Sequence, residues 1–213
     1  MKIYSQDFLK RLKKWTRENN IYLIADEIMT GFGRTGKMFA CEYADIEPDF
    51  LCIAKGLTAG WLPLSAVLTT NNIYELFYDH HNSDKTFWHS NTHYGNALAA
   101  SVAIETLNII EEENLCNRAM VLESVMLPMM QEIADSTQRL SNIRSIGAIV
   151  AADLIGDNLG LEIHKNAMNL GAYLRPIGNT IYWLPPLNTN FSTLEELGHI
   201  TKMAIINLRR KRP

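Results

Sequence analysis

The chain has 213 residues, of which 47% are hydrophobic and 20% are charged, a composition typical of globular proteins. Its formal net charge of −3 argues against a nucleic acid or an acidic membrane surface as the main partner. The sequence contains no uninterrupted run of about 18 apolar residues, so no transmembrane helix is expected. Its three cysteines have neither paired nor CxxC spacing and predict reduced thiols in a cytoplasmic protein.

The first part of the chain has the pattern of a helix followed by short strands. Ser5 is expected to cap a helix that runs to about Asn19, since apolar and basic residues fall largely on opposite faces. A polar loop with interspersed aromatic residues is expected from about 79 to 94. Short apolar runs predict buried parallel strands at 21–25 and 50–54, and a third strand at 64–68. This order of elements is typical of part of a doubly wound α/β sheet.

The rest of the chain combines longer helices with short strands. Pro128 is expected to kink or break the helix predicted at about 115–134. Apolar periodicity predicts helices at about 96–112, 115–134, 159–170 and 193–209, and strands near 143–146, 148–154 and 180–184. We therefore expect a partial α/β domain over residues 1–112 and a smaller α+β domain over residues 113–213.

Two of the predicted strands end on a single charged residue. Asp26 follows the apolar run Ile21–Ala25, and Lys55 follows Phe50–Ala54. Ligands of open α/β sheets bind just beyond the carboxyl ends of such strands. Each residue alone has an ordinary explanation, because Asp often caps a turn or helix and Lys is usually solvated. Together they start from backbone expected to be buried, where an unpaired charge is costly, and this favours a ligand that pairs with both.

A carboxylate and an amine at one sheet edge suit pyridoxal phosphate. The carboxylate keeps the pyridine nitrogen protonated, so that the ring can accept electrons from the α-carbon of a substrate. A lysine amine bonds to the aldehyde of the cofactor when it is neutral, and burial near positive charge favours that form. Once the substrate has displaced it, the amine can carry a proton. Asp26 and Lys55 therefore predict a pyridoxal-phosphate site.

The glycine-rich segment Gly31–Gly36 matches GxGxxG and nearly matches the P-loop pattern. A dinucleotide-binding motif turns directly from strand into helix, whereas residues 26–30 intervene here and no helical pattern follows. The P-loop needs a hydroxyl group after its lysine, but Met38 follows Lys37. Nucleotide binding is therefore not expected, and the plainer interpretation is a tight surface loop that needs positive φ angles.

With these residues in place, the sequence resembles the class III, fold-type I pyridoxal-phosphate aminotransferases. The matching run extends from Leu23 to Gly36 and continues through Pro48-Asp49 to Ala54–Gly60. Three further stretches resemble the adenosylmethionine-8-amino-7-oxononanoate aminotransferases of biotin synthesis, namely 36–42, 89–96 and 175–182. The resemblance covers essentially the whole chain. It implies a homodimeric transaminase whose substrates are S-adenosylmethionine and 8-amino-7-oxononanoate.

The resemblance also implies roles for individual residues in holding the cofactor. Asp26 would pair with the pyridine nitrogen, and Lys55 would bond covalently to the aldehyde. Asn91 and Thr92 would bind the phosphate of a cofactor held mainly by the other subunit, because a hydroxyl group and adjacent backbone N–H groups suit that anion.

The substrate would contact Lys55, Ser90, Arg175 and Tyr182. Of these, Arg175 would hold the carboxylate of the keto substrate, which its planar guanidinium suits. No metal site is expected, since the histidines at the two ends of 89–93 lie in a loop with no glutamate in HExxH register.

Chains of this family are longer, and this sequence begins in the middle of the expected large domain. It lacks the glycine- and serine-rich phosphate-binding loop, the aromatic residue that stacks on the cofactor, and neighbouring strands. We therefore expect a C-terminal portion of the fold with unpaired strand edges and an exposed apolar face. Two alternatives remain open: another ω-aminotransferase, of the ornithine or 4-aminobutyrate type, and a non-catalytic remnant or half that needs a complementary chain.

Overall fold

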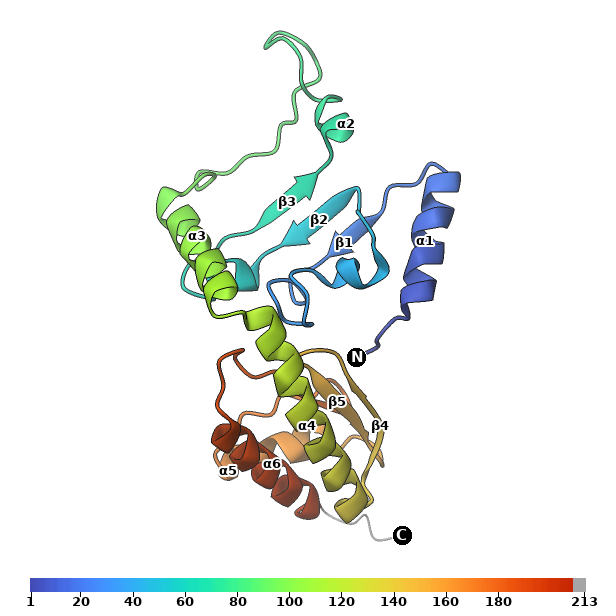
Figure 1. Cartoon of the computed structure of the whole chain (residues 1–213), viewed down its shortest axis with the longest axis vertical. Coiled ribbons are helices and arrows are strands. Elements are labelled where there is room, and N and C mark those ends of the chain that lie inside the picture. Colours follow the sequence, from blue (N-terminus) through green and yellow to red (C-terminus); the bar gives the residue numbers. More distant parts are fainter. Residues whose placement is uncertain (209–213) are drawn as a thin grey trace. The chain divides into compact units, whose positions relative to one another are not determined.

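The computed structural model describes residues 1–208 and divides them into two units, each with its own three-stranded sheet (Figure 1). One unit comprises residues 4–116, and the other comprises residues 117–208 together with 1–3. The division falls after Cys116. The domain boundary predicted from the sequence follows residue 112, four residues earlier.

The sheet of the first unit has the strand order β1 (Ile24–Asp26), β2 (Phe50–Ile53) and β3 (Ala66–Thr69). β1 and β2 are parallel, as predicted, whereas β3 runs antiparallel to β2. Only a short 3₁₀ helix, η2 (Lys55–Thr58), lies between β2 and β3, and a parallel neighbour would need a longer crossover. The apolar pattern of the strands does not specify this reversal of direction.

The predicted helices of this unit are present and capped. The Oγ atom of Ser5 accepts a hydrogen bond from the backbone N–H of Phe8, and Asn96 caps its helix in the same way. A segment without helix or strand precedes Asn96, as predicted (Figure 1). The helical elements besides η2 are α1 (Gln6–Glu18), the 3₁₀ helix η1 (Ala40–Ala44), α2 (Asn71–Tyr74) and α3 (Ala97–Glu112).

Part of the sheet of this unit is uncovered. Ile24 and Val67, which share one face of the sheet, are 62% and 60% exposed, and Leu68 on the opposite face is 50% exposed. β1 is the first strand in the order β1-β2-β3, so its outer edge pairs with no other described strand. β1 is also shorter than the predicted run from Ile21. The expected exposed apolar face and unpaired edge are therefore present in the part of the chain that the structure describes.

The second unit contains an antiparallel sheet in the order β4 (Leu140–Ser145), β5 (Val150–Leu154) and β6 (Thr180–Trp183). Its helices are α4 (Leu115–Thr137), α5 (Gly160–Asn169) and α6 (Phe191–Ile206). α4 continues through Pro128 as one helix, so of the two outcomes predicted there, a kink or a break, the break is absent. The predicted end of the last helix, Arg209, lies outside the described residues. No described helix, α4 included, combines the length and apolar character needed to cross a membrane.

The core of the second unit is packed around Trp183, which is 1% exposed. Its indole N–H donates to the hydroxyl oxygen of Thr201 at 3.0 Å, and both groups are buried. A Cβ atom on Gly198 would lie 2.5 Å from the Cε atom of Met129, so α6 packs closely against α4 at this point. The hydrogen bond of the indole therefore links β6 to α6 inside this core.

We predict that Thr201→Val destabilises this unit by about 1–3 kcal/mol, because the variant leaves a buried indole N–H without an acceptor. Amide hydrogen exchange of β5 and β6 measures the loss. Thr201→Ser keeps the hydroxyl group and is the matched control. Equal exchange in wild type and the valine variant would contradict the prediction.

Candidate active site

The parallel pairing of β1 and β2 brings Asp26 and Lys55 to the same edge of the sheet. Asp26 is the last residue of β1 and lies in register with Cys52 of β2. The backbone N–H of Glu27 donates to the carbonyl oxygen of Cys52 at 2.9 Å, so the pairing extends to this edge. Lys55 opens η2 directly beyond the end of β2. The two residues are thus placed beyond the carboxyl ends of adjacent parallel strands, where such sheets bind ligands.

Both side chains are exposed, although the sequence predicts that they start from buried backbone. For Asp26 the reason is an open face of β1, since Ile24, on the same face of the strand, is also exposed. One carboxylate oxygen of Asp26 accepts from the backbone N–H of Ile28 at 3.0 Å, which orients the group. Lys55 has a φ angle of 39°, a left-handed conformation that is uncommon for a side-chain-bearing residue. The evidence for a site is therefore the placement of Asp26 and Lys55 beyond adjacent parallel strands. The cost of burying two unpaired charges does not contribute, since both side chains are exposed.

Asp49 holds the opposite end of the same strand pair. Its Oδ2 atom accepts from the backbone N–H of Leu23 at 2.7 Å and from Nζ of Lys13 at 3.2 Å. The carbonyl oxygen of Leu23 accepts from the N–H groups of Asp49 and Phe50 at 2.9 and 3.1 Å. Partial burial favours a higher pKa for Asp49, but these hydrogen bonds outweigh it and keep the pKa below its ordinary value. Asp49 thereby helps to fix the alignment of β1 with β2.

Glu27 forms hydrogen bonds that hold together the segment following β1. It is 3% exposed, and its Oε1 atom accepts from the backbone N–H of Cys41 at 2.8 Å. Its other carboxylate oxygen accepts from the hydroxyl group of Thr30. Burial, together with the charge of Glu27, raises the pKa of the Cys41 thiol to about 11, so this thiol is protonated at neutral pH. No role for Glu27 was predicted from the sequence, although an acidic residue next to Asp26 before a glycine-rich loop was a visible signal.

The glycine-rich loop packs beneath the turn that follows β2. Gly33 and Gly36 have φ angles of 83° and 94°, as the tight-loop interpretation predicts. The prediction of a surface loop is wrong, because Phe32 is 4% exposed. A Cβ atom on Gly56 would lie 2.8 Å from the Cβ atom of Phe32, so position 56 requires the close approach that only glycine allows. The loop therefore supports the backbone next to Lys55.

Three predicted site residues lie together in the segment between α2 and α3. These three residues, all exposed, are Ser90, Asn91 and Thr92. The side-chain oxygen of Asn91 accepts from the backbone N–H of His93 at 2.8 Å, which forms a local turn. β3 runs antiparallel to β2 and carries the chain away from the edge at which β1 ends, and the segment begins beyond that far end (Figure 1). The described contacts do not bring these residues to Asp26 or Lys55.

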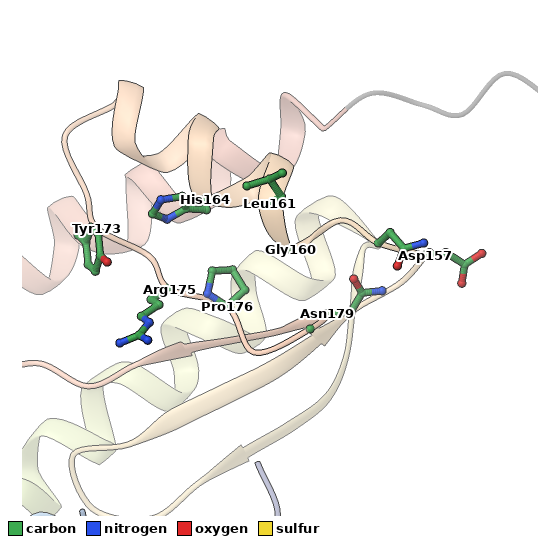
Figure 2. Close-up of a pocket in the computed structure, with 10 residues that line it drawn as sticks. Asp157, Gly160, Leu161, His164, Tyr173, Arg175, Pro176 and Asn179 are labelled. Atoms are coloured by element: carbon green, nitrogen blue, oxygen red, sulfur yellow. The ribbon is translucent and has the colours of Figure 1, made fainter.

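Arg175 and Tyr182 belong to the second unit and occupy different surroundings there. Arg175 is exposed and lines an open depression of about 1010 Å³ with His164, Tyr173 and other residues (Figure 2). Tyr182 lies on β6, opposite Ala151 of β5, is half-buried, and does not line this depression. The structure therefore places the two predicted substrate residues in one unit without joining them in one pocket.

Comparison with known proteins identifies the family. Residues 1–205 match the family described as aminotransferase class-III. The chain belongs to this family. Class III aminotransferases are pyridoxal-phosphate-dependent transaminases of fold-type I, so the predicted fold class and the cofactor of the family are confirmed.

Individual relatives agree with this assignment. An adenosylmethionine-8-amino-7-oxononanoate aminotransferase from Helicobacter pylori is 42% identical over 197 residues, which are 87% of this chain and 44% of the relative. The solved structure of a transaminase from the marine bacterium Virgibacillus is 28% identical, with a TM-score of 0.90, and the match covers 97% of this chain and 49% of that one. An acetylornithine aminotransferase from Elizabethkingia anophelis is 29% identical, with a TM-score of 0.85 and coverage of 96% and 52%. This class III chain thus spans about half the length of the relatives it matches.

We predict that Asp49→Asn lowers the stability of the β1–β2 pair at neutral pH by about 1 kcal/mol, because a charge-assisted hydrogen bond is lost in a partly exposed position. The depressed pKa of Asp49 means that its stabilisation is complete above the pKa of the unfolded chain, about 3.9. It is lost as the pH falls through the lower pKa of the folded state. The difference between wild type and variant should therefore disappear in strong acid.

Amide hydrogen exchange of β2, corrected for the intrinsic rate at each pH, measures this difference. Glu47→Gln removes an exposed carboxylate two residues away and serves as the matched control. An Asn variant as stable as wild type at neutral pH would show that Asp49 does not hold the strand pair.

Proposed function

We propose that this chain supplies the lysine and the carboxylate of a transaminase that transfers an amino group from S-adenosylmethionine to 8-amino-7-oxononanoate, giving 7,8-diaminononanoate for biotin synthesis. The observation that carries the proposal is the parallel β1–β2 pair, with Asp26 and Lys55 beyond its carboxyl end. The name of the 42% identical relative supports the choice of substrates.

Asp26 and Lys55 fit the cofactor of the family. Pyridoxal phosphate, when bound, withdraws electrons from the α-carbon of the amino substrate. Asp26 would hold the proton on the pyridine nitrogen, and the N–H of Ile28 supports this role by orienting one carboxylate oxygen. Lys55 would bind the aldehyde covalently and, once freed, would move a proton at the α-carbon.

The exposed positions of the other candidate residues are compatible with their proposed roles. Arg175 has no hydrogen bond or ion pair among the described residues, and its guanidinium would bind the carboxylate of the keto substrate. Tyr182 and Ser90 would contact the substrate. Asn91 and Thr92 would bind the phosphate of the cofactor in the other subunit of a homodimer, and a residue that serves a second chain must be exposed in its own.

Residues 1–112 would form part of the cofactor-binding domain, and residues 113–213 the C-terminal domain. A cytoplasmic location is part of the same proposal. It is supported by the three cysteines, which are free and only half-buried.

Two alternatives have some support. An ω-aminotransferase of the ornithine type is favoured by the similarity to the acetylornithine enzyme, but that similarity is 29% against 42% for the biotin-pathway relative. A half that needs a complementary chain is favoured by the exposed apolar residues and the unpaired edge of β1. This second alternative concerns what the chain needs for activity and leaves the proposed chemistry unchanged.

We predict that Lys55 is the residue that pyridoxal phosphate labels. The purified chain is incubated with the cofactor and reduced with borohydride, and the modified peptide is mapped by mass spectrometry. Lys55→Arg should abolish specific labelling, and Asp26→Asn should weaken it about tenfold or more, since a charge-assisted contact is lost. Lys37→Arg, at the exposed position that follows the glycine-rich loop, is the matched control. Labelling spread over several surface lysines would favour a non-catalytic remnant.

The substrate is tested in a chimera, in which this chain replaces the matched 197-residue region of the Helicobacter pylori relative. We predict transamination of 8-amino-7-oxononanoate with S-adenosylmethionine as donor, and no reaction with acetylornithine. A Lys55→Arg chimera provides the inactive control. Acceptance of acetylornithine together with refusal of 8-amino-7-oxononanoate would end the biotin assignment and favour the ornithine-type alternative.

A further inference from the structure

His164 lies on α5 and contacts the segment that carries Arg175. Its Nδ1 atom is 2.5 Å from the backbone carbonyl oxygen of Leu174. Its ring meets the ring of Tyr173 edge-on, with centroids 5.4 Å apart. Because a carbonyl oxygen only accepts, the shared hydrogen belongs to Nδ1 of His164. The histidine therefore binds the two residues that directly precede Arg175.

The same segment is also fixed on the other side of Arg175. A Cβ atom on Gly160 would lie 2.1 Å from the carbonyl oxygen of Gly178, so the start of α5 touches this backbone. The side-chain oxygen of Asn179 accepts from the backbone N–H of Leu159 at 2.9 Å. Figure 2 shows the side chain of Arg175 extending from the stretch of backbone that runs from Tyr173 to Asn179, next to the helix that carries Gly160 and His164. These contacts therefore hold the stretch on both sides of Arg175.

We propose that His164 is a positioning residue for Arg175. This inference rests on the proposed function, in which Arg175 binds the carboxylate of 8-amino-7-oxononanoate. The carbonyl group of Leu174 belongs to the same planar peptide unit as the nitrogen and the Cα atom of Arg175, so the hydrogen bond from His164 orients the backbone bond from which that side chain branches. No described hydrogen bond or ion pair holds the guanidinium itself, and a two-pronged contact with a carboxylate depends on its orientation.

The test follows the side-chain Nε–H signal of Arg175 by NMR in the 213-residue chain during titration with 8-amino-7-oxononanoate. Isothermal titration calorimetry measures the affinity of every variant for each ligand, including Arg175→Gln, which lacks this signal. The methyl ester of the same compound is titrated in parallel, because it lacks the charged carboxylate. His164→Leu removes the donor. His164→Asn keeps an amide N–H close to the position of Nδ1 and is the conservative variant. Arg175→Gln gives the reference for complete loss of the contact.

We expect the acid, but not the ester, to shift the Arg175 signal in wild type. His164→Leu should weaken binding of the acid about five- to tenfold, the equivalent of one lost hydrogen bond, and leave the ester unaffected. His164→Asn should restore affinity to within about twofold of wild type. A merely structural role would weaken both ligands in the leucine variant and would overturn the inference.

The failure of the inference and that of the proposed function have different signatures. If Arg175→Gln weakens binding of the acid and His164→Leu does not, the positioning role of His164 is wrong and the role of Arg175 stands. If the acid and the ester give the same response in wild type, Arg175 is not the carboxylate-binding residue, and both proposals fail at this point.

Discussion

The candidate active site of this protein depends on one short pairing of parallel strands. β1 and β2 are paired at only three positions. This pairing alone determines that Asp26 and Lys55 both lie beyond the carboxyl ends of the strands. In a parallel pair the carboxyl ends coincide, so groups that follow the two strands meet without further structure. An antiparallel arrangement of the same sequences would send the carboxylate and the amine to opposite ends of the sheet.

Several residues outside the predicted site stabilise this arrangement. Asp49 joins the amino ends of the two strands through Leu23, and Glu27 folds the chain back after β1. Phe32 of the glycine-rich loop lies against Gly56, next to the lysine. These contacts explain why a glycine-rich pattern that imitates a nucleotide-binding motif occurs here. Its glycines allow the loop to pack closely inside the unit, and a phosphate ligand is not needed to account for them.

Local sequence patterns predicted much of the fold. The cap at Ser5 and the periodicity of the helices are properties of neighbouring residues, and the structure confirms them, whereas the cap at Asn96 was not predicted. Pro128 did not break its helix, because one missing backbone donor can be tolerated in a helix that buries a long apolar face. The direction of β3 was not predicted, since it depends on the length of the connection and on the partners of the strand.

The sequence predicted which residues form the candidate site. It did not predict the contacts that hold those residues in place. Asp26 and Lys55 could be found because each follows a strand-like run. The exposure of both side chains could not be found in this way, because burial depends on which segments cover the sheet. Similarly, His164 is an ordinary helical residue in the sequence, and its bond to Leu174 appears only when α5 and the following segment are folded together.

The central claim is that Asp26 and Lys55 contact opposite ends of one pyridine ring. The most direct test is the NMR signal of pyridoxal phosphate labelled with nitrogen-15 in its ring and bound to the chain. Our account predicts a protonated ring nitrogen in wild type, loss of that proton in Asp26→Asn, and no bound signal in Lys55→Arg. A ring nitrogen whose protonation is the same in wild type and in the Asp26 variant would contradict it.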